Sequence, residues 1–208
     1  EERGLVVTLS GSVLFRSGWG EQATILAAKC GPLHNHNHID QGSFILSVAG
    51  ENLITEGGVT DYYDDPFYRT WFIQPAAHNT LLIDRNPESQ RVADYAGEIK
   101  ALDRHGVIDE SICGNGYGYA RFLLHPLYRG VERYSREILF FPPDGVVLID
   151  SVQSSEGNHE YDLRFHPRFK RDLAVERDVA IFRGETGAVV MKWAADRELA
   201  ARIVDSPI

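Results

Sequence analysis

Short apolar or alternating runs, separated by turn-forming residues, are the feature that most constrains the fold of this chain. The clearest case is REILFFPPDGVVLIDSV (136–152), in which two apolar runs flank the letters PPDG. Proline, aspartate and glycine at such a position favour a tight turn, and apolar runs of this length are typical of strands. The segment therefore predicts a β-hairpin.

Similar runs recur along the chain and predict an all-β domain. The residues expected in strands are 12–18, 23–31, 42–50, 53–58, 79–87, 136–152, 159–167 and 179–194. Apart from DRELAARIV (196–204), no segment of ten or more residues shows the 3.6-residue period of an amphipathic helix. We therefore expect a single domain over residues 1–208, folded as a large antiparallel β-sandwich.

Composition and charge exclude several classes of protein. The chain has 208 residues, of which 43% are hydrophobic, and this suffices for one globular domain with a sizeable core. The formal net charge of −9 argues against a nucleic-acid-binding protein, because such a protein presents a basic surface. No apolar run is long enough to span a membrane as a helix. Cys30 and Cys113 leave open whether they form a disulfide or remain thiols.

Residues 34–40 carry the most unusual side-chain pattern. His34, His36, His38 and Asp40 occupy alternate positions, so an extended backbone would direct all four side chains to one side. Such a row indicates a metal site, an acid–base site or a polar surface. A His-x-His pair on one face of a strand is a common start of a zinc site, and we therefore favour a metal site.

Further metal donors could come from other segments. Glu56 is the single carboxylate in the otherwise apolar segment LITEGG (53–58), and His78 begins a strand after the long irregular segment 58–78. Together with the histidine pair, these residues would complete a set of three or four donors. Asp40 follows an imidazole by two residues, a position that suits a carboxylate that orients the histidine rather than a ligand.

Two motifs occur in a characteristic order: His-x-His-x-Asp-x-x-Ser-Phe over residues 36–44, and His-Asn-Thr at 78–80 followed by Gln90. This order resembles the C-terminal β-sandwich domain of the heparinase II/III-like polysaccharide lyases. That family includes heparin and heparan lyases as well as several alginate and oligoalginate lyases. The resemblance continues more diffusely through 136–152 and 159–167, so it covers nearly the whole chain.

The resemblance implies cleavage of a uronic-acid-containing polysaccharide by β-elimination. A base removes the C5 proton beside the carboxylate, and the glycosidic oxygen leaves C4 with the help of an acid. That proton becomes removable when a nearby asparagine, histidine, arginine or cation neutralises the carboxylate. The substrate would be an acidic polysaccharide or oligosaccharide. Such enzymes are by default periplasmic or secreted, whereas members that trim oligosaccharides can be cytoplasmic.

The resemblance also assigns site residues. His38, Glu56 and His78 would bind a metal, zinc or another divalent ion. His36 would face the substrate, and Tyr68 in the sequence FYRTW would reach the cleft, so these two are the candidate catalytic residues of this domain. The loop that carries Tyr68 varies within the family, and Tyr62 or Tyr63 could take its place.

Two features depart from the family pattern. The carboxylate ligand is commonly an aspartate in an Asp-x-Gly setting, whereas this chain has Glu56-Gly57-Gly58. The main catalytic tyrosine of the family, and the asparagine or histidine that neutralises the carboxylate, lie on an N-terminal helical domain. This chain holds no such region and begins without a methionine. We therefore expect it to be part of a longer protein, to need that helical domain as a partner, and to be inactive alone.

Two other functions are compatible with histidines on strands. A cupin-like metal oxygenase also uses a His-x-His pair, but it places a glutamate about four residues later, and this chain has Gly42 there instead. The other alternative is a non-catalytic carbohydrate-binding or structural sandwich, in which the histidines are polar but bind no metal.

Overall fold

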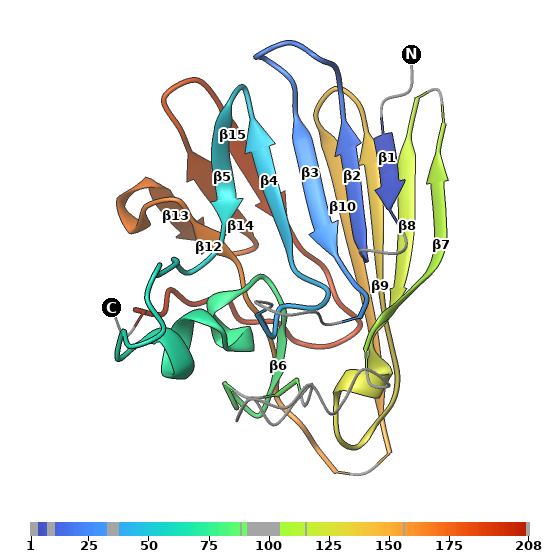
Figure 1. The fold of residues 1–208 in the computed structure, drawn as a ribbon, viewed down its shortest axis with the longest axis vertical. Coiled ribbons are helices and arrows are strands. Elements are labelled where there is room, and N and C mark those ends of the chain that lie inside the picture. Colours follow the sequence, from blue (N-terminus) through green and yellow to red (C-terminus); the bar gives the residue numbers. More distant parts are fainter. Residues whose placement is uncertain are drawn as a thin grey trace.

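The structure is a computed structural model that describes residues 4–7, 11–32, 38–87, 89–90, 105–114, 116–155 and 157–206. Within these residues the chain forms fifteen strands and four short helical turns (Figure 1). The strands are β1 (Gly4–Val7), β2 (Ser12–Arg16), β3 (Ile25–Lys29), β4 (Phe44–Val48), β5 (Glu51–Thr55), β6 (Leu81–Ile83), β7 (Val107–Cys113), β8 (Gly118–Leu123), β9 (Val131–Phe141), β10 (Gly145–Ser154), β11 (Tyr161–Leu163), β12 (His166–Pro167), β13 (Leu173–Glu176), β14 (Val179–Arg183) and β15 (Ala188–Lys192). The helical turns are η1 (Tyr68–Phe72), η2 (Pro75–Ala77), η3 (His125–Leu127) and η4 (Lys170–Asp172).

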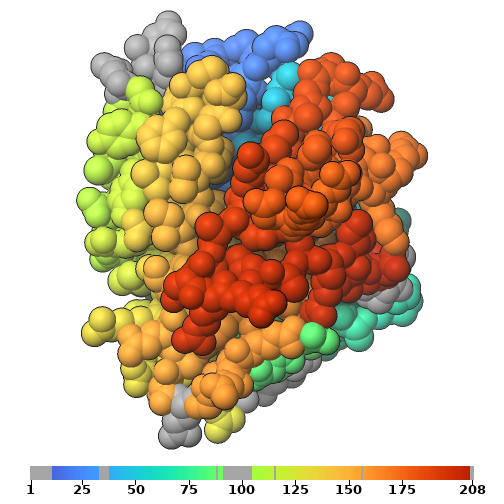
Figure 2. Space-filling model, turned by 180° about the vertical axis from the view of Figure 1, so that it is seen from behind, coloured from blue at the N-terminus to red at the C-terminus, as the bar shows by residue number. Residues whose placement is uncertain are grey.

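These strands form antiparallel sheets arranged as a sandwich. The largest sheet has the order β1-β2-β3-β4-β5-β12, and a second has the order β10-β9-β8-β7. A three-stranded sheet, β13-β14-β15, and a two-stranded pair, β11-β6, complete the described part of the fold. Figure 1 shows the four-stranded and three-stranded sheets behind the six-stranded sheet. Seen from behind in Figure 2, the yellow surface of β9 and β10 adjoins the orange and red surface of the C-terminal third. The predicted all-β antiparallel sandwich is thus confirmed.

The core lies between the sheets and follows from the alternation of side chains along each strand. In β2, Val13 and Phe15 are buried, while their neighbours are only half-buried. Phe15 packs against Phe140 of β9, with ring centroids 6.0 Å apart and planes 17° from parallel, and so joins the two sheets. Each such buried aromatic side chain stabilises the fold by roughly 2 kcal/mol.

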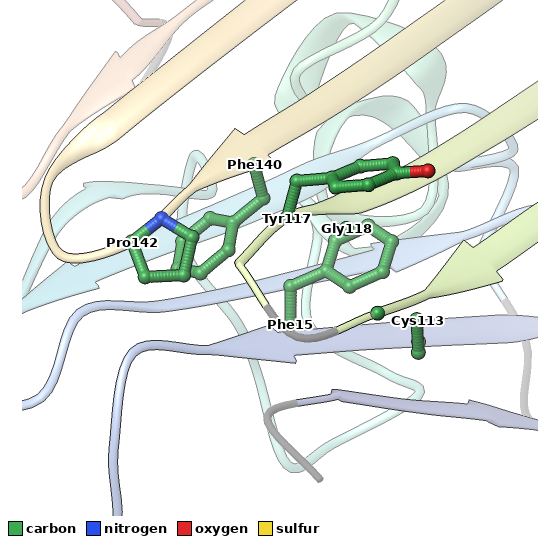
Figure 3. A pocket seen from close by; sticks show the side chains of 7 residues that line it. Phe15, Cys113, Tyr117, Gly118, Phe140 and Pro142 are labelled. Atoms are coloured by element: carbon green, nitrogen blue, oxygen red, sulfur yellow. The ribbon is translucent and has the colours of Figure 1, made fainter.

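A small pocket opens at one end of this core. Figure 3 shows the side chains that line it, among them the rings of Phe15, Phe140, Tyr117 and Pro142. Gly118 makes the close packing there feasible, because an added Cβ would lie 2.4 Å from Cδ1 of Phe15. The pocket contains none of the candidate metal ligands.

Most of the predicted strands are observed. Each of the eight predicted segments overlaps at least one strand, and the hairpin predicted over 136–152 is formed by β9 and β10. The helical pattern of residues 196–204 was misleading, because this segment has no regular secondary structure. The region 58–78 is less irregular than expected. It contains η1, a single π-helical turn with an N–H of Ile73 donating to the carbonyl of Tyr68, and the 3-10 turn η2.

Among the described residues, the helical turns are all too short to cross a membrane.

Candidate metal centre

The ends of three segments meet on one side of the six-stranded sheet. His38 lies before β4, Glu56 directly follows the last residue of β5, and His78 follows η2. Their ligand atoms all lie within 4.8 Å of one another. His78 is fully buried, whereas His38 and Glu56 are half-buried. The three residues predicted as metal ligands therefore converge in space. We call His38, Glu56 and His78 the metal cluster.

The Gly57 backbone explains how Glu56 comes to lie beside His78. The N–H of Gly57 donates to the carbonyl of Ala77 at 2.7 Å, and the indole N–H of Trp71 donates to the carbonyl of Gly57 at 2.8 Å. A Cβ at position 57 would lie 2.8 Å from Cζ2 of Trp71 and 3.1 Å from the Ala77 backbone. A glycine is therefore needed where the end of β5 approaches η2, and this accounts for the first glycine of Glu56-Gly57-Gly58.

The buried imidazole of His78 has the arrangement expected of a metal ligand. Its Nδ1 atom lies 2.9 Å from Oε1 of Glu56, and its ring centroid lies 5.2 Å from that of His38. Nδ1 faces the Glu56 carboxylate, whereas Nε2 of His78 has no hydrogen-bonding partner within the described part of the chain. A buried polar atom without a partner is costly, so Nε2 calls for a ligand.

The electrostatics of the metal cluster favour the protonation states that a metal needs. Burial, together with the neighbouring His78, lowers the pKa of His38. Burial alone would raise the pKa of Glu56, but the contacts with His78, His38 and the Ser43 hydroxyl lower it below its ordinary value. A neutral imidazole and an ionised carboxylate are the forms that coordinate divalent ions.

The donor set fits zinc or a similar divalent ion. Two imidazole nitrogens and one carboxylate oxygen are ligands that zinc accepts, and three protein ligands leave a coordination position for another molecule. The longer side chain of Glu56, in place of the aspartate common in the family pattern, still brings its carboxylate to His78. The residues present therefore could hold a metal.

Comparison with known proteins identifies the family to which the fold belongs. The sequence matches the family model "Heparinase II/III-like, C-terminal" over residues 7–203. The chain belongs to this family. The match supports the lyase interpretation of the histidine pattern over the cupin-like alternative.

The relatives of this heparinase II/III-like domain are longer proteins. It is 35% identical over 79 residues to a heparin-sulfate lyase of Pedobacter heparinus and 25% identical over 151 residues to a heparin-sulfate lyase of Bacteroides stercoris. These alignments cover 36% and 71% of this chain, but only 12% and 20% of the two relatives.

Solved structures show the same fold. The crystal structure of the heparan sulfate lyase of Pedobacter heparinus matches with a TM-score of 0.77 at 21% identity, over 93% of this chain and 29% of that chain. A heparinase III structure matches with a TM-score of 0.71 at 18% identity, over 91% of this chain and 29% of that one. The heparinase II/III-like domain thus spans less than a third of each of these relatives.

Of the two candidate catalytic residues, the structure describes only Tyr68. His36, like His34, lies outside the described residues. Tyr68 is described and is largely buried, with 8% of its surface exposed, and its ring meets that of Tyr63 edge to face at 5.0 Å. Tyr62 and Tyr63 are 71% and 61% exposed, so they are the accessible tyrosines of this loop. The catalytic roles remain predictions.

Asp40 forms an ion pair that the sequence did not predict. Its carboxylate forms an ion pair with Lys29 of β3, with Nζ at 2.8 Å from Oδ1 and 3.1 Å from Oδ2. Among the described residues this lysine is the ion-pair partner of Asp40, and the Asp40 charge also acts on His38, where it opposes the lowering of the pKa. The pair ties the segment after His38 to the neighbouring strand.

Other residues of the two sequence motifs hold the metal cluster in place. The hydroxyl of Ser43 donates to Oε1 of Glu56 at 3.3 Å and accepts the N–H of Asn79 at 3.0 Å. Gln90 holds the segment after His38 through two hydrogen bonds. Its amide oxygen accepts the N–H of Gln41, and its amide nitrogen donates to the carbonyl of Gln41. The sequence motifs include Asn79 and Gln90, but they give no sign that these two side chains bind the backbone of neighbouring segments.

Asn79 is the most connected of these residues. Its Nδ2 donates to the carbonyls of Phe44 in β4 and Thr55 in β5, at 2.6 and 2.5 Å. Its Oδ1 accepts the N–H of His166 in β12 at 2.8 Å. The residue next to His78 therefore joins three strands of the six-stranded sheet, and this fixes the imidazole relative to the end of β5.

Proposed function

We propose that this chain is the β-sandwich domain of a polysaccharide lyase that cleaves uronic-acid-containing polysaccharide by β-elimination. Membership of the heparinase II/III-like family supports the proposal, as does similarity to proteins named heparin-sulfate lyases. The observation that carries it is the convergence of His38, Glu56 and His78 within 4.8 Å at the ends of separate segments. A sandwich with a purely structural role has no need of two imidazoles and a carboxylate at one point.

The proposed chemistry assigns a task to each residue of the site. His38, Glu56 and His78 bind zinc or another divalent ion, which would supply positive charge near the substrate carboxylate. His36 and Tyr68 act in proton transfer. The C5–H bond breaks, its electron pair forms the C4=C5 double bond, and the C4–O bond breaks as the leaving oxygen takes up a proton. The products are an unsaturated uronide and a new chain end, without consumption of water.

We further propose that the complete active site includes groups from an N-terminal helical domain of the same protein. The solved relatives extend well beyond the matched region, which covers 29% of their chains. In this proposal the isolated sandwich folds and binds metal but does not turn over substrate, and the parent protein is periplasmic or secreted.

The test is an elimination assay on the parent protein that contains this domain. Heparan sulfate, heparin and alginate are offered separately, and the unsaturated product is followed by its ultraviolet absorbance. We expect product from at least one polymer and a loss of at least about 100-fold in rate for His36→Ala and Tyr68→Phe, the scale of an acid–base contribution. His125→Ala, a histidine outside the metal cluster, serves as the control and should keep the wild-type rate.

Two results would contradict the proposal. Absence of unsaturated product from every uronic-acid polymer, while the protein binds these polymers, would favour the non-catalytic carbohydrate-binding alternative. Wild-type rates for both His36→Ala and Tyr68→Phe would remove these residues from the reaction.

A further inference from the structure

Arg136 is a buried charged residue that the site described above does not use. It lies in β9 of the four-stranded sheet, and only 1% of its surface is exposed. Its Nε and Nη2 atoms donate to the two carboxylate oxygens of Asp150 in β10, at 2.9 and 3.2 Å. Such a bidentate pair neutralises the charge and fixes the plane of the guanidinium group.

The remaining nitrogen of the guanidinium group reaches across the core to the other layer of the sandwich. Nη1 of Arg136 donates to the carbonyl of Gly42 at 2.6 Å and to the carbonyl of Asn79 at 2.7 Å. One nitrogen atom thus joins two backbone segments that are far apart in the sequence. Each of the two segments carries a histidine of the metal cluster: His38 precedes Gly42, and His78 precedes Asn79.

The two carbonyls belong to residues adjacent to those that form the site. Gly42 precedes Ser43, whose hydroxyl donates to Glu56. Asn79 follows His78, the buried imidazole of the cluster. A shift of the Gly42 carbonyl would therefore move the Ser43 hydroxyl that contacts Glu56. A shift of the Asn79 carbonyl would move the ring of His78.

A purely structural role does not explain a charged residue at this place. Burial of an ion pair is costly, and apolar side chains of similar volume often stabilise a core equally well. What apolar residues cannot do is donate hydrogen bonds in a fixed plane to two carbonyls and a carboxylate at once. A lysine ammonium group also lacks this planar arrangement of donors.

We propose that Arg136 is a positioning residue of the metal centre, which fixes the segment before Ser43 and the segment after His78 at the separation that zinc binding requires. This inference rests on the proposed metal function. It concerns the four-stranded sheet, from which no ligand comes, and assigns that sheet a direct part in building the site.

The test compares three variants of the whole chain. Arg136→Lys keeps a positive charge but loses the planar donors. The double variant Arg136→Met with Asp150→Leu removes both charges together, so that neither remains buried alone. Tyr134→Phe is the matched control, because the buried hydroxyl of Tyr134 also donates to Asp150, at 2.8 Å, but does not contact the segments beside the metal cluster.

Zinc affinity is measured by competition with a chromogenic chelator, and unfolding midpoints are recorded alongside. We expect Arg136→Lys and the double variant to bind zinc at least about 10-fold more weakly, as found for residues that orient metal ligands. Tyr134→Phe should lower the unfolding midpoint but keep the wild-type zinc affinity. Equal loss of zinc affinity in Tyr134→Phe, or wild-type affinity in the double variant, would overturn the proposal.

A second measurement on metal-free protein separates this inference from the proposed metal function. Amide hydrogen exchange of Ser43, Asn79 and Thr80 should be faster in the double variant than in Tyr134→Phe. If the wild-type chain takes up no zinc, the metal function fails, yet faster exchange still supports the positioning role. Unchanged exchange at these amides would overturn the positioning role, whether or not zinc is bound. Should the double variant fail to fold, Arg136→Lys is used for both measurements.

Discussion

Nδ1 of the fully buried His78 lies 2.9 Å from Oε1 of Glu56, although the whole loop with η1 and η2 separates the two residues in the sequence. The contact depends on hydrogen bonds that neither residue makes itself. The backbone of Gly57 binds that of Ala77, and Asn79 binds the carbonyl of Thr55. The residues that flank the ligands therefore determine the geometry of the metal cluster.

Ser43→Ala should weaken both the fold and the metal site. The variant loses the hydroxyl that donates to Glu56 and leaves the buried N–H of Asn79 without its acceptor. We expect the free energy of unfolding in urea to fall by about 1–3 kcal/mol, the cost of an unpaired buried group. Zinc affinity should fall by about 10- to 100-fold. Ser47→Ala, on strand β4 that follows Ser43, should change neither quantity. An unaltered zinc affinity in Ser43→Ala would show that the hydroxyl does not orient Glu56.

Asn79→Asp should destabilise the six-stranded sheet while preserving side-chain volume. The carboxylate cannot donate to the carbonyls of Phe44 and Thr55, and it would place a charge in a fully buried position. We expect the free energy of unfolding to fall by about 3 kcal/mol or more. The matched control is Asn52→Asp on β5, which is exposed and should stay within about 0.5 kcal/mol of wild type. Equal stability of the two variants in urea would disprove the clamp.

Prediction from the sequence worked where a local pattern carries the information. Strands β2, β3 and β4 have buried residues at alternating positions, such as Val13 and Phe15, and the turns between them contain glycine. Strand β7 was missed, because its residues VIDESIC are mostly exposed and show no alternation. The segment 196–204 has a helical pattern but remains without regular structure, since a weak amphipathic pattern does not by itself stabilise a helix.

For the site, the residue types that bind metals could be predicted, but the residues that hold them could not. Histidine and glutamate are residue types that commonly bind metals, and His38, Glu56 and His78 do converge. Arg136 gave no such signal, because its role depends on which carbonyls lie opposite β9 across the core. The burial of Tyr68 could not be predicted from the sequence either, because it depends on the π-helical turn that ends at Phe72.

The two cysteines should differ in reactivity. Both are thiols in the structure, Cys30 fully buried and Cys113 exposed. Burial raises the pKa of the Cys30 thiol well above its ordinary value, so the reactive thiolate is suppressed there. Titration of the native protein with a thiol reagent should modify Cys113 rapidly and Cys30 only after denaturant is added. The variant Cys113→Ser should show no rapid reaction, and rapid modification of two thiols in the native wild type would contradict the structure.

Acidification should destabilise the metal-free protein through His166. Burial and the neighbouring His78 lower the pKa of His166 to about 4, while in the unfolded chain it lies near 6.5. The unfolded state therefore binds a proton first, and the stability that comes from the neutral ring is present above pH 6.5 and lost as the pH falls towards 4. The loss should approach about 3 kcal/mol. Urea unfolding at pH 7 and pH 4.5, in the presence of a chelator, measures it.

A matched variant isolates this effect from other titrating groups. His166→Gln retains a side-chain donor for the carbonyl of Ala76, which Nε2 of His166 contacts at 3.1 Å, but it does not titrate. The variant should lose less stability than wild type between the two pH values. An identical pH dependence for both proteins would assign the acid sensitivity to other residues.

The central claim is that His38, Glu56 and His78 form one metal site. Its most direct test is the zinc content of the purified chain after equilibration with zinc and removal of unbound metal, determined by elemental analysis. We expect one zinc ion per chain in the wild type and a loss of bound zinc in each of His38→Ala, Glu56→Gln and His78→Ala, with His125→Ala unchanged. A wild-type chain that retains no zinc, or cluster variants that retain as much zinc as the wild type, would contradict the claim.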